Sequence, residues 1–366
     1  MEDLNTGMTA DESVIDTILG AASQTRTDST ALKAMVRTHG DSQKARMAHA
    51  NRVLQAACAA AGIITTATIA DEEDENAKLG AAKRDEMLAD YDAIVATFIG
   101  EEVTKLAKKL NLDHAVAAKL ITEKGDPQIN PKQFAKAYAA TTLPNKLLAT
   151  FSQFQLCALH RELERAEARA LKHVERALEQ IPVWNQWLVN VRGCGPAIGG
   201  VILASIDIAK AEYPSSLWRY AGLDVGPDGR GRSKRPEHLV ERSYLDKDGK
   251  EAKRMGVTHN PELKTRLFLL ATSFIKAGGP YRAIYDDRKL RLESHPVYGA
   301  HNDGKEIEGK GKVSKGRRHM MAMREMQKRF LVDLYKAWRT IEGLPVAPEY
   351  SEAKLGLTHG SAAKYS

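Results

Sequence analysis

One short segment limits how this chain can fold, because two glycines and a proline separate two apolar stretches within it. The segment runs Val191-Arg192-Gly193-Cys194-Gly195-Pro196-Ala197-Ile198-Gly199-Gly200. Glycine adopts the positive φ values of a tight reversal at little cost. A first helical turn tolerates proline because the missing N–H would have no intrahelical partner. The pattern predicts a helix-hairpin-helix turn, with positive φ at Gly193 and Gly195 and a new helix from Pro196.

The predicted turn offers backbone N–H groups to an anion. At the start of a helix these groups and the helix dipole attract negative charge, and a contact with phosphate carries no sequence information. An ordinary turn of a helical bundle is the alternative. The apolar face that continues through Val201 and Ile202, together with the basic surroundings, favours a phosphate contact. The predicted contact residues are Gly193, Gly195, Pro196, Ala197, Ile198 and Gly199.

Charge is divided unevenly along the chain, whose net charge is +7. Residues 1–150 hold 17 Lys and Arg against 21 Asp and Glu, whereas residues 151–366 hold 37 against 26. A basic half of this size favours a polyanionic partner, because each neutralised phosphate releases counterions. General solubility is the alternative, but it rarely separates charge in this way. The charge distribution therefore predicts a polyanionic partner.

Two basic stretches supply further candidate phosphate contacts. Residues 226–236 form a Gly-rich loop that cannot build a core, so we expect it to be mobile or ordered by its partner, with a disordered linker as the alternative. Residues 310–318 form the second stretch. Arginine suits phosphate because it can engage two oxygens at once. The candidates are Arg230, Arg232, Lys234, Arg235, Lys315, Arg317 and Arg318.

Apolar residues recur at helical spacing through most of the chain, which predicts a mainly α fold. Short helices are expected at residues 31–37 and 46–62, separated by polar linkers, and at residues 78–100 and 101–110. Prolines divide residues 126–144 into short pieces.

Residues 151–181 predict one long charged helix that Pro182 ends. Its apolar stripe, at spacings of three to five, supports either a homo-oligomer contact or an intramolecular antiparallel partner, because it keeps no strict heptad. Trp184 and Trp187 are expected to pack where this helix meets the hairpin. The predicted stripe comprises Phe154, Leu159, Leu163, Ala166, Ala170, Val174 and Leu178.

Three more helices follow the hairpin in our prediction. The first is capped near Ser215 and ends at Gly222, the second covers residues 260–277, and the third runs from His319 to about Ile341. A small strand hairpin around Asp248 and Gly249 lies between the first two. The predicted core residues of the last two helices are Leu263, Leu267, Leu270, Phe274, Met323, Met326, Phe330, Leu334 and Trp338.

Four segments follow from these patterns. They are a helical amino-terminal module (1–150), the long charged helix (151–182), a nucleic-acid-binding helical domain (183–345) and a flexible tail (346–366). Cys58, Cys157 and Cys194 lie far apart, as in a reducing cytoplasm, and the histidines have no metal-ligand spacing. No leader is recognisable, and no apolar run approaches the roughly 18 residues of a membrane helix. We expect a cytoplasmic protein without a membrane partner.

The order of features across residues 151–345 resembles one bacterial transposase family. A charged helix, the Gly-x-Gly-Pro hairpin, the run Trp218-x-Tyr220-Ala221-Gly222-Leu223, a basic Gly-rich loop and an amphipathic helix follow one another. The resemblance is to the carboxyl-terminal domain of the bridge-RNA-guided insertion-sequence transposases. Those proteins pair an RNase H-like DEDD domain with a helix-hairpin-helix transposase domain.

The resemblance implies DNA as the partner, with a structured RNA as a second one, and DNA strand exchange through a serine nucleophile beside metal-bound carboxylates. Two departures concern the enzyme. Residues 1–150 look helical and lack the strands of a DEDD domain, so no cofactor is identified and Mg²⁺ is expected only if such a site exists. Asp228 stands before Gly229, where the family has its serine, which leaves Ser233 as the catalytic candidate, without an identifiable base.

Three functions therefore remain open. The first is a DNA-binding protein related to these transposases that acts in transposition or recombination. The second is a non-catalytic DNA- or RNA-binding protein of a mobile element or prophage. The third is a helical nucleic-acid scaffold that oligomerises through residues 151–181.

Overall fold

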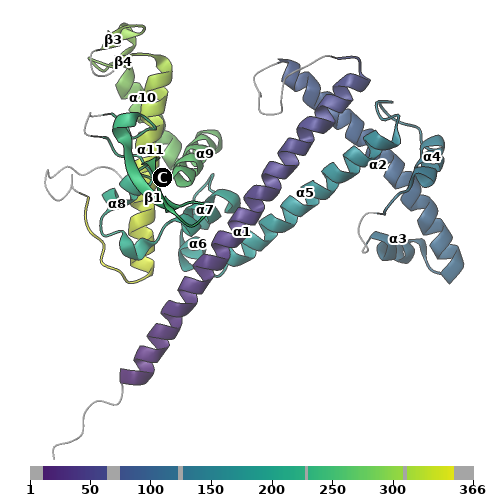
Figure 1. The fold of residues 1–366 in the computed structure, drawn as a ribbon, viewed down its shortest axis with the longest axis horizontal. Coiled ribbons are helices and arrows are strands. Elements are labelled where there is room, and N and C mark those ends of the chain that lie inside the picture. Colours follow the sequence, from purple (N-terminus) through teal and green to yellow (C-terminus); the bar gives the residue numbers. More distant parts are fainter. Residues whose placement is uncertain (1–10, 64–74, 123–126, 227–229, 308–310, 350–366) are drawn as a thin grey trace, which may run out of the picture. The chain divides into compact units, whose positions relative to one another are not determined.

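The computed structural model describes residues 11–63, 75–122, 127–226, 230–307 and 311–349. These residues form a mainly helical structure with two small two-stranded sheets (Figure 1), which confirms the predicted fold class. The chain divides into two compact units, one of Thr38–Ala170 and one of Met1–Arg37 with Leu171–Ser366. We call them the small unit and the large unit.

The helices of the amino-terminal half are longer than the sequence predicts. They are α1 (Asp11–Ala60), α2 (Glu75–Leu110), α3 (His114–Thr122), α4 (Pro131–Ala140) and α5 (Phe151–Leu178). The separate helices predicted at 31–37 and 46–62 are wrong, because one helix spans both. His39 and Gly40 are buried at helical spacing from Val36, so the apparent polar linker continues the packed face of α1. The two pieces predicted at 78–100 and 101–110 are likewise one helix.

An aromatic cluster forms the core of the small unit. Phe154 of α5 has its ring centroid 4.9 Å from that of Tyr91 and 5.1 Å from that of Phe134. Pro131 begins α4, and the Asn130 side chain accepts bonds from the first backbone N–H groups of that helix, including that of Gln133 (3.0 Å). This agrees with the predicted break in the chain.

A buried carboxylate organises the loop before α5. Asp90 of α2 accepts hydrogen bonds from the backbone N–H groups of Asn145 (2.9 Å), Leu147 (2.7 Å) and Leu148 (3.2 Å). The side chain of Asp90 is fully buried. These bonds satisfy three donors that the loop would otherwise leave unpaired.

The stripe of α5 packs within the chain. Arg46 of α1 forms an ion pair with Glu167, and the rings of His49 and His160 lie 6.3 Å apart, so the two helices run antiparallel in the small unit. This is the intramolecular alternative of the prediction. Leu159 was wrongly placed in the stripe: it is 47% exposed. Its place is taken by Cys157 and His160, which are buried, and α5 ends at Leu178.

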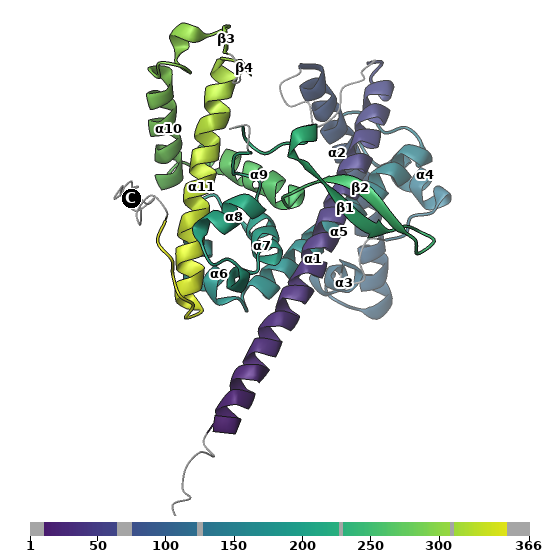
Figure 2. The ribbon, with the colours of Figure 1, turned by 60° about the vertical axis from the view of Figure 1, so that its left-hand side comes forward.

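Six α-helices of the large unit follow α5, joined in places by short 3₁₀ turns, and α10 runs beside α11 in both views (Figures 1 and 2). They are α6 (Pro182–Gln186), α7 (Pro196–Ser205), α8 (Pro214–Tyr220), α9 (Pro261–Ala277), α10 (Pro280–Glu293) and α11 (Lys315–Ile341). The turns are η1 (Leu188–Asn190), η2 (Ile208–Lys210), η3 (Pro236–His238) and η4 (Ala300–Asn302).

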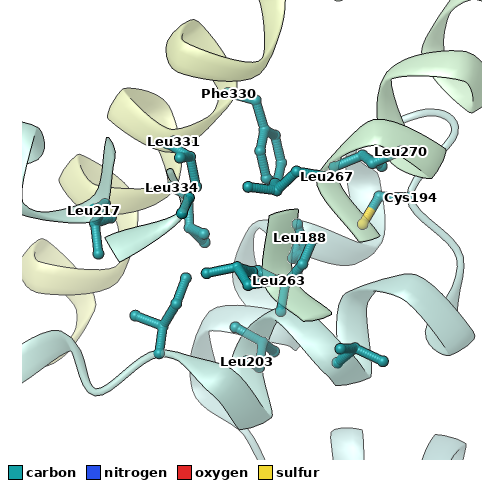
Figure 3. Packing of buried hydrophobic residues seen from close by; sticks show 14 of the residues in the cluster. Leu188, Cys194, Leu203, Leu217, Leu263, Leu267, Leu270, Phe330, Leu331 and Leu334 are labelled. Carbon is teal, nitrogen blue, oxygen red and sulfur yellow. The ribbon is translucent and has the colours of Figure 1, made fainter. Parts of the chain in front are cut away.

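Apolar faces of α9 and α11 meet residues of the hairpin in one core. Figure 3 shows Leu188 and Cys194 of the hairpin near Leu267 and Leu270 of α9, with Phe330 of α11 beside them. All nine core residues predicted for the last two helices are buried. Trp187 stacks on Phe330 at 6.0 Å, and Trp184 lies against Gly199, as expected at this junction.

Two helix starts differ from the prediction. Helix α8 begins at Pro214 after Tyr213, without a side-chain cap, so Ser215 is not its cap. Helix α11 begins at Lys315 with Ser314 as its cap, four residues before the predicted start. The end of α8 is as predicted. Gly222 has φ +67°, and the next N–H, of Leu223, donates to the carbonyl of Trp218 (2.8 Å).

The predicted strand hairpin is present as a long ribbon (Figure 2). Strands β1 (Leu239–Leu245) and β2 (Glu251–Val257) pair antiparallel from Leu239 opposite Val257 to Leu245 opposite Glu251. Gly249 in the connecting turn has φ +75°. A second, smaller sheet joins β3 (Glu306–Ile307) to β4 (Gly311–Lys312).

The start of the predicted flexible tail is held in place. The N–H of Ala347 donates to the Tyr335 hydroxyl (3.1 Å), and the buried Glu349 accepts from Arg329 (3.1 Å). Residues 350–366 of that tail lie outside the described residues. No helix among the described residues has the length and apolar character needed to cross a membrane.

Candidate nucleic-acid interface

The hairpin turn forms where the sequence predicts it, but only one of its glycines is in the left-handed region. Gly193 has φ +96°, whereas Gly195 has φ −80° and is the N-cap of α7, which corrects the prediction of two positive angles. A Cβ on Gly193 would lie 3.1 Å from Phe274 of α9, and its carbonyl accepts from Ser273 Oγ (2.7 Å). Gly193 is therefore needed for close packing against the end of α9.

Fewer residues of the hairpin turn are placed to contact a phosphate than the sequence predicts. The N–H groups of Ile198 and Gly199 donate to the carbonyl of Gly195 (3.1 and 2.9 Å), and no acceptor among the described residues takes the N–H of Gly195 or Ala197. Gly199 is buried under the Trp184 ring, so it is a packing position and not a contact surface. The edge that can meet a phosphate is Gly195, Pro196 and Ala197.

The basic loop is ordered by the chain itself at its described residues. Val225 and Gly231 form a β-bridge, and the N–H of Gly226 donates to the carbonyl of Arg230 (2.7 Å). Residues 227–229 lie outside the description. Lys234 and Arg235 are exposed, and Arg230 is half-buried.

Beside this loop, four cations lie close enough to Asp224 to interact with its charge. We call Arg232, Lys264, Arg324 and Lys328 the basic cluster. Arg232 Nε lies 3.0 Å from Asp224 Oδ2, and Lys264 Nζ donates to the carbonyl of Arg232 (2.6 Å). The Lys328 ammonium lies 4.9 Å from the centre of the Trp218 ring, a cation–π contact.

Glycine at position 231 allows the Arg324 side chain to approach the backbone of the basic loop. A Cβ on Gly231 would overlap the guanidinium of Arg324, so only glycine lets that guanidinium lie against the loop backbone. The loop therefore joins the cluster through Arg324 of α11 as well as through Arg232.

The cluster is electrostatically unfavourable in the free protein. Burial lowers the pKa of Lys264 and the neighbouring Arg324 lowers it further, while burial also lowers the pKa values of Arg324 and Lys328. Asp224 Oδ1 is buried without a hydrogen-bond partner among the described residues. Glu325 acts on Lys328 and partly offsets its charge, but four cations near Asp224 and Glu325 still leave an excess of positive charge that a bound anion would neutralise.

Sequence reasoning missed three of these four cations. Lys264 lies on α9, and Arg324 and Lys328 lie on α11, about 60 residues later. A signal was available in the spacing of Arg324 and Lys328, because like charges four residues apart weaken an isolated helix.

Ser233 has a histidine beside it that the sequence did not indicate. Its Oγ lies 3.2 Å from Nδ1 of the buried His238, and its backbone N–H donates to the same nitrogen (3.1 Å). The N–H of Arg235 donates to the Ser233 hydroxyl (3.3 Å). These bonds fold the loop locally, and they also place a base within reach of a hydroxyl.

The start of α11 contains one predicted contact that is structural. Arg318 is buried, and its guanidinium binds both oxygens of Asp303 (2.5 and 2.9 Å) and the carbonyl of Tyr298 (3.1 Å). It is therefore not a phosphate contact, which corrects the prediction. Arg317 stacks on the ring of Tyr298 (5.1 Å), and Lys315 is exposed.

The structure provides no assignment for a Mg²⁺ site. Within the described residues, no group of three potential ligands from His, Cys, Asp and Glu lies together. The described part of residues 1–150 is helical, so the strand that carries the first carboxylate in DEDD proteins has no counterpart there.

Comparison with family models, with curated proteins and with solved structures finds no match to this chain. The resemblance to transposases therefore stays a prediction from the sequence.

Proposed function

We propose that this chain is a DNA-binding protein that holds the phosphate backbone with the basic cluster, the basic loop and the hairpin turn of its large unit. One observation carries the proposal: four half-buried cations lie close together beside the basic loop, and only Arg232 among them forms an ion pair with Asp224. Proteins rarely keep such an excess of half-buried charge without a partner of opposite sign. A phosphate backbone supplies that partner repeatedly.

The spacing of the two features supports a duplex as the ligand. The hairpin packs on Phe274 near the end of α9, whereas Lys264 lies near its start. Ten residues of helix span about 15 Å, which is the rise of about four to five base pairs at 3.4 Å each. Four to five base pairs of duplex are therefore long enough to span the distance between the two features.

The proposed setting is the transposition or recombination machinery of a mobile element. The order of hairpin, Trp-x-Tyr-Ala-Gly-Leu helix end, basic loop and amphipathic helix supports it. In this setting the chain anchors DNA, and a structured RNA is the alternative ligand with the same backbone chemistry.

A charge-neutralised variant tests the binding function. We expect Lys264→Gln/Arg324→Gln/Lys328→Gln to weaken binding to a 30-base-pair duplex and to reduce the slope of log K against log salt by about 2 to 3, since each phosphate contact contributes about 0.9. The matched control removes three cations from α10, as Arg282→Gln/Lys289→Gln/Arg291→Gln. Equal salt slopes for both variants would exclude the cluster as the phosphate site.

The same assay separates the ligands. A hairpin RNA and a 30-nucleotide single strand, competed against the duplex, rank the three partners. Preference for the RNA by the wild type would replace DNA with RNA in the proposal. Thermal unfolding of each variant checks that a lost affinity is not a lost fold.

Strand transfer is the second candidate function, and the contact between Ser233 and His238 favours it. In this mechanism His238 would take the proton of Ser233 Oγ as the hydroxyl attacks a phosphodiester, with Arg232 and Lys234 placed to stabilise the negative charge. The Oγ–P bond forms as the bond from phosphorus to one deoxyribose oxygen breaks, and that oxygen leaves with the proton that His238 returns. A strand-transfer assay with Mg²⁺ compares wild type, Ser233→Ala and Ser233→Thr. Product from wild type that disappears in Ser233→Ala supports this function, whereas a fully active Ser233→Ala excludes Ser233.

A further inference from the structure

The two faces of the β1–β2 ribbon differ in charge. Because side chains alternate along a strand, one face carries Glu241, Lys253 and Glu251, and Lys253 pairs with Glu241 at 2.7 Å. The other face carries Arg242 and Arg254 as its charged residues. The first face is balanced with a slight negative excess, whereas the second face is wholly positive.

The two arginines lie directly opposite each other. The strand register pairs Arg242 with Arg254, both side chains are exposed, and no carboxylate among the described residues forms an ion pair with either. Like charges directly opposite in a sheet are destabilising. Arg254 also lies over the ring of Tyr244, 5.1 Å from its centre, which restricts its side chain on the same face of the ribbon. An anionic or hydrogen-bond-accepting partner would relieve this repulsion.

Both ends of the β1–β2 ribbon connect to segments that carry residues of the basic cluster. Strand β1 begins directly after Ser233–His238, and strand β2 ends just before His259 and the helix that carries Lys264. The arginine pair lies three residues from the base of the ribbon, which corresponds to about 10 Å. A duplex held by its phosphates at the basic cluster therefore has a groove within reach of the arginine pair.

We propose that the β1–β2 ribbon enters the major groove of duplex DNA with Arg242 and Arg254 facing the base edges. This inference rests on the proposed DNA-binding function and adds where the bases are contacted. The major groove is about 12 Å wide and admits a two-stranded ribbon, and arginine is the side chain that binds guanine O6 and N7 together. The narrow major groove of an RNA duplex does not admit such a ribbon.

Protection of guanine N7 from methylation by dimethyl sulfate tests the inference on a mixed-sequence 30-base-pair duplex. We expect wild-type protein to protect N7 at one or two positions, and Arg242→Ala/Arg254→Ala to lose that protection with about a tenfold or larger drop in affinity, because each bidentate contact contributes about tenfold. The control Glu241→Ala/Lys253→Ala changes the opposite face and is expected to retain protection.

A charge-preserving variant separates base contact from phosphate contact. Arg242→Lys/Arg254→Lys keeps both charges but cannot form the bidentate contact, so we expect guanine protection to fall while the salt slope stays near that of wild type. Equal unfolding temperatures for wild type and the three variants show that the fold is intact.

The outcomes distinguish the two proposals. Duplex binding that survives in Arg242→Ala/Arg254→Ala with N7 protection intact overturns the ribbon inference alone. Protection of adenine N3, in the minor groove, in place of guanine N7 also overturns it. Failure of the wild type to bind duplex DNA overturns both proposals.

Discussion

Two turns of this molecule contain backbone N–H groups that are not paired within a helix or a sheet. The two turns differ in the hydrogen-bond acceptor that these groups meet. In the small unit, the loop before α5 gives three N–H groups to the carboxylate of Asp90. In the large unit, the N–H groups of Gly195 and Ala197 meet no acceptor among the described residues. The first turn contains its own anion, whereas the second has no acceptor among the described residues, which is the arrangement that the proposed phosphate contact requires.

Charged side chains repeat this contrast. In the small unit, Arg46 pairs with Glu167, and Arg161 pairs with Asp92 and Glu164. In the basic cluster, only Arg232 forms an ion pair with Asp224, and Lys264 donates to a backbone carbonyl. The incomplete pairing is local to the cluster, because Arg318 and Arg329 of the same unit are paired with Asp303 and Glu349. This local difference is the one on which the proposed binding function depends.

The largest loss of stability is expected when the buried carboxylate of Asp90 is removed. Asp90→Ala leaves three loop N–H groups without an acceptor in a buried site, so we expect the free energy of unfolding to fall by about 3 to 5 kcal/mol. Urea denaturation measures it. Asp85→Ala removes a mostly exposed carboxylate from the same helix and is expected to change stability by about 1 kcal/mol or less. Equal losses in the two variants would remove the contrast between the turns.

A smaller loss of stability is expected when the charge of Asp224 in the basic cluster is removed. The same change is expected to strengthen DNA binding. Asp224→Asn removes the carboxylate that pairs with Arg232 in the basic cluster, so we expect a loss of stability of about 2 kcal/mol and a duplex affinity about threefold higher. Denaturation and fluorescence anisotropy measure the two quantities. Asp207→Asn, an acidic position of the same unit paired with Lys210, serves as control. Weaker DNA binding by Asp224→Asn would contradict an anion site at the cluster.

Duplex binding is expected to depend on the charge of residue 195 in the hairpin turn and not on the size of its side chain. Gly195 has an ordinary φ and open space around its Cβ position, so both Gly195→Glu and Gly195→Gln should fold normally. We expect the glutamate to weaken duplex binding about tenfold and to flatten its salt dependence, while the glutamine stays near wild type. Similar affinities for the two variants would show that the turn does not contact phosphate.

The smallest effect concerns acid stability of the small unit. Burial, and after it Arg52, lowers the pKa of His49, and burial also lowers the pKa of His160. Below the ordinary value of 6.5 the folded state therefore binds fewer protons than the unfolded state, and stability falls as the pH falls through this range but is unaffected above it. We expect His49→Gln to reduce this loss by about 1 kcal/mol per pH unit or less, measured by urea denaturation at pH 7 and pH 5. The exposed His114→Gln is the control, and an unchanged acid loss in His49→Gln would contradict the assignment.

The sequence predicted local features of this fold better than long-range ones. The hairpin, the strand ribbon and the buried faces of α9 and α11 follow from spacing and turn residues within about 30 positions. The continuity of α1 did not, because His39 and Gly40 look polar until the packing of their helix is known. The basic cluster did not either, since Lys264 and Arg324 meet only after α9 and α11 pack together. Arg318 shows the converse, because a basic run does not reveal that Asp303 will bury one of its members.

The base of the ribbon has a consequence for how this protein can vary. Leu239 and Val257 are paired, so the chain leaves the helical unit and returns to it within about 5 Å, one interstrand spacing. Residues between these two positions can be lengthened, shortened or replaced while α8 and α9 keep their places, because closing a longer loop costs little entropy. Evolution or protein engineering can therefore change the length and sequence of the ribbon while the helical scaffold stays the same.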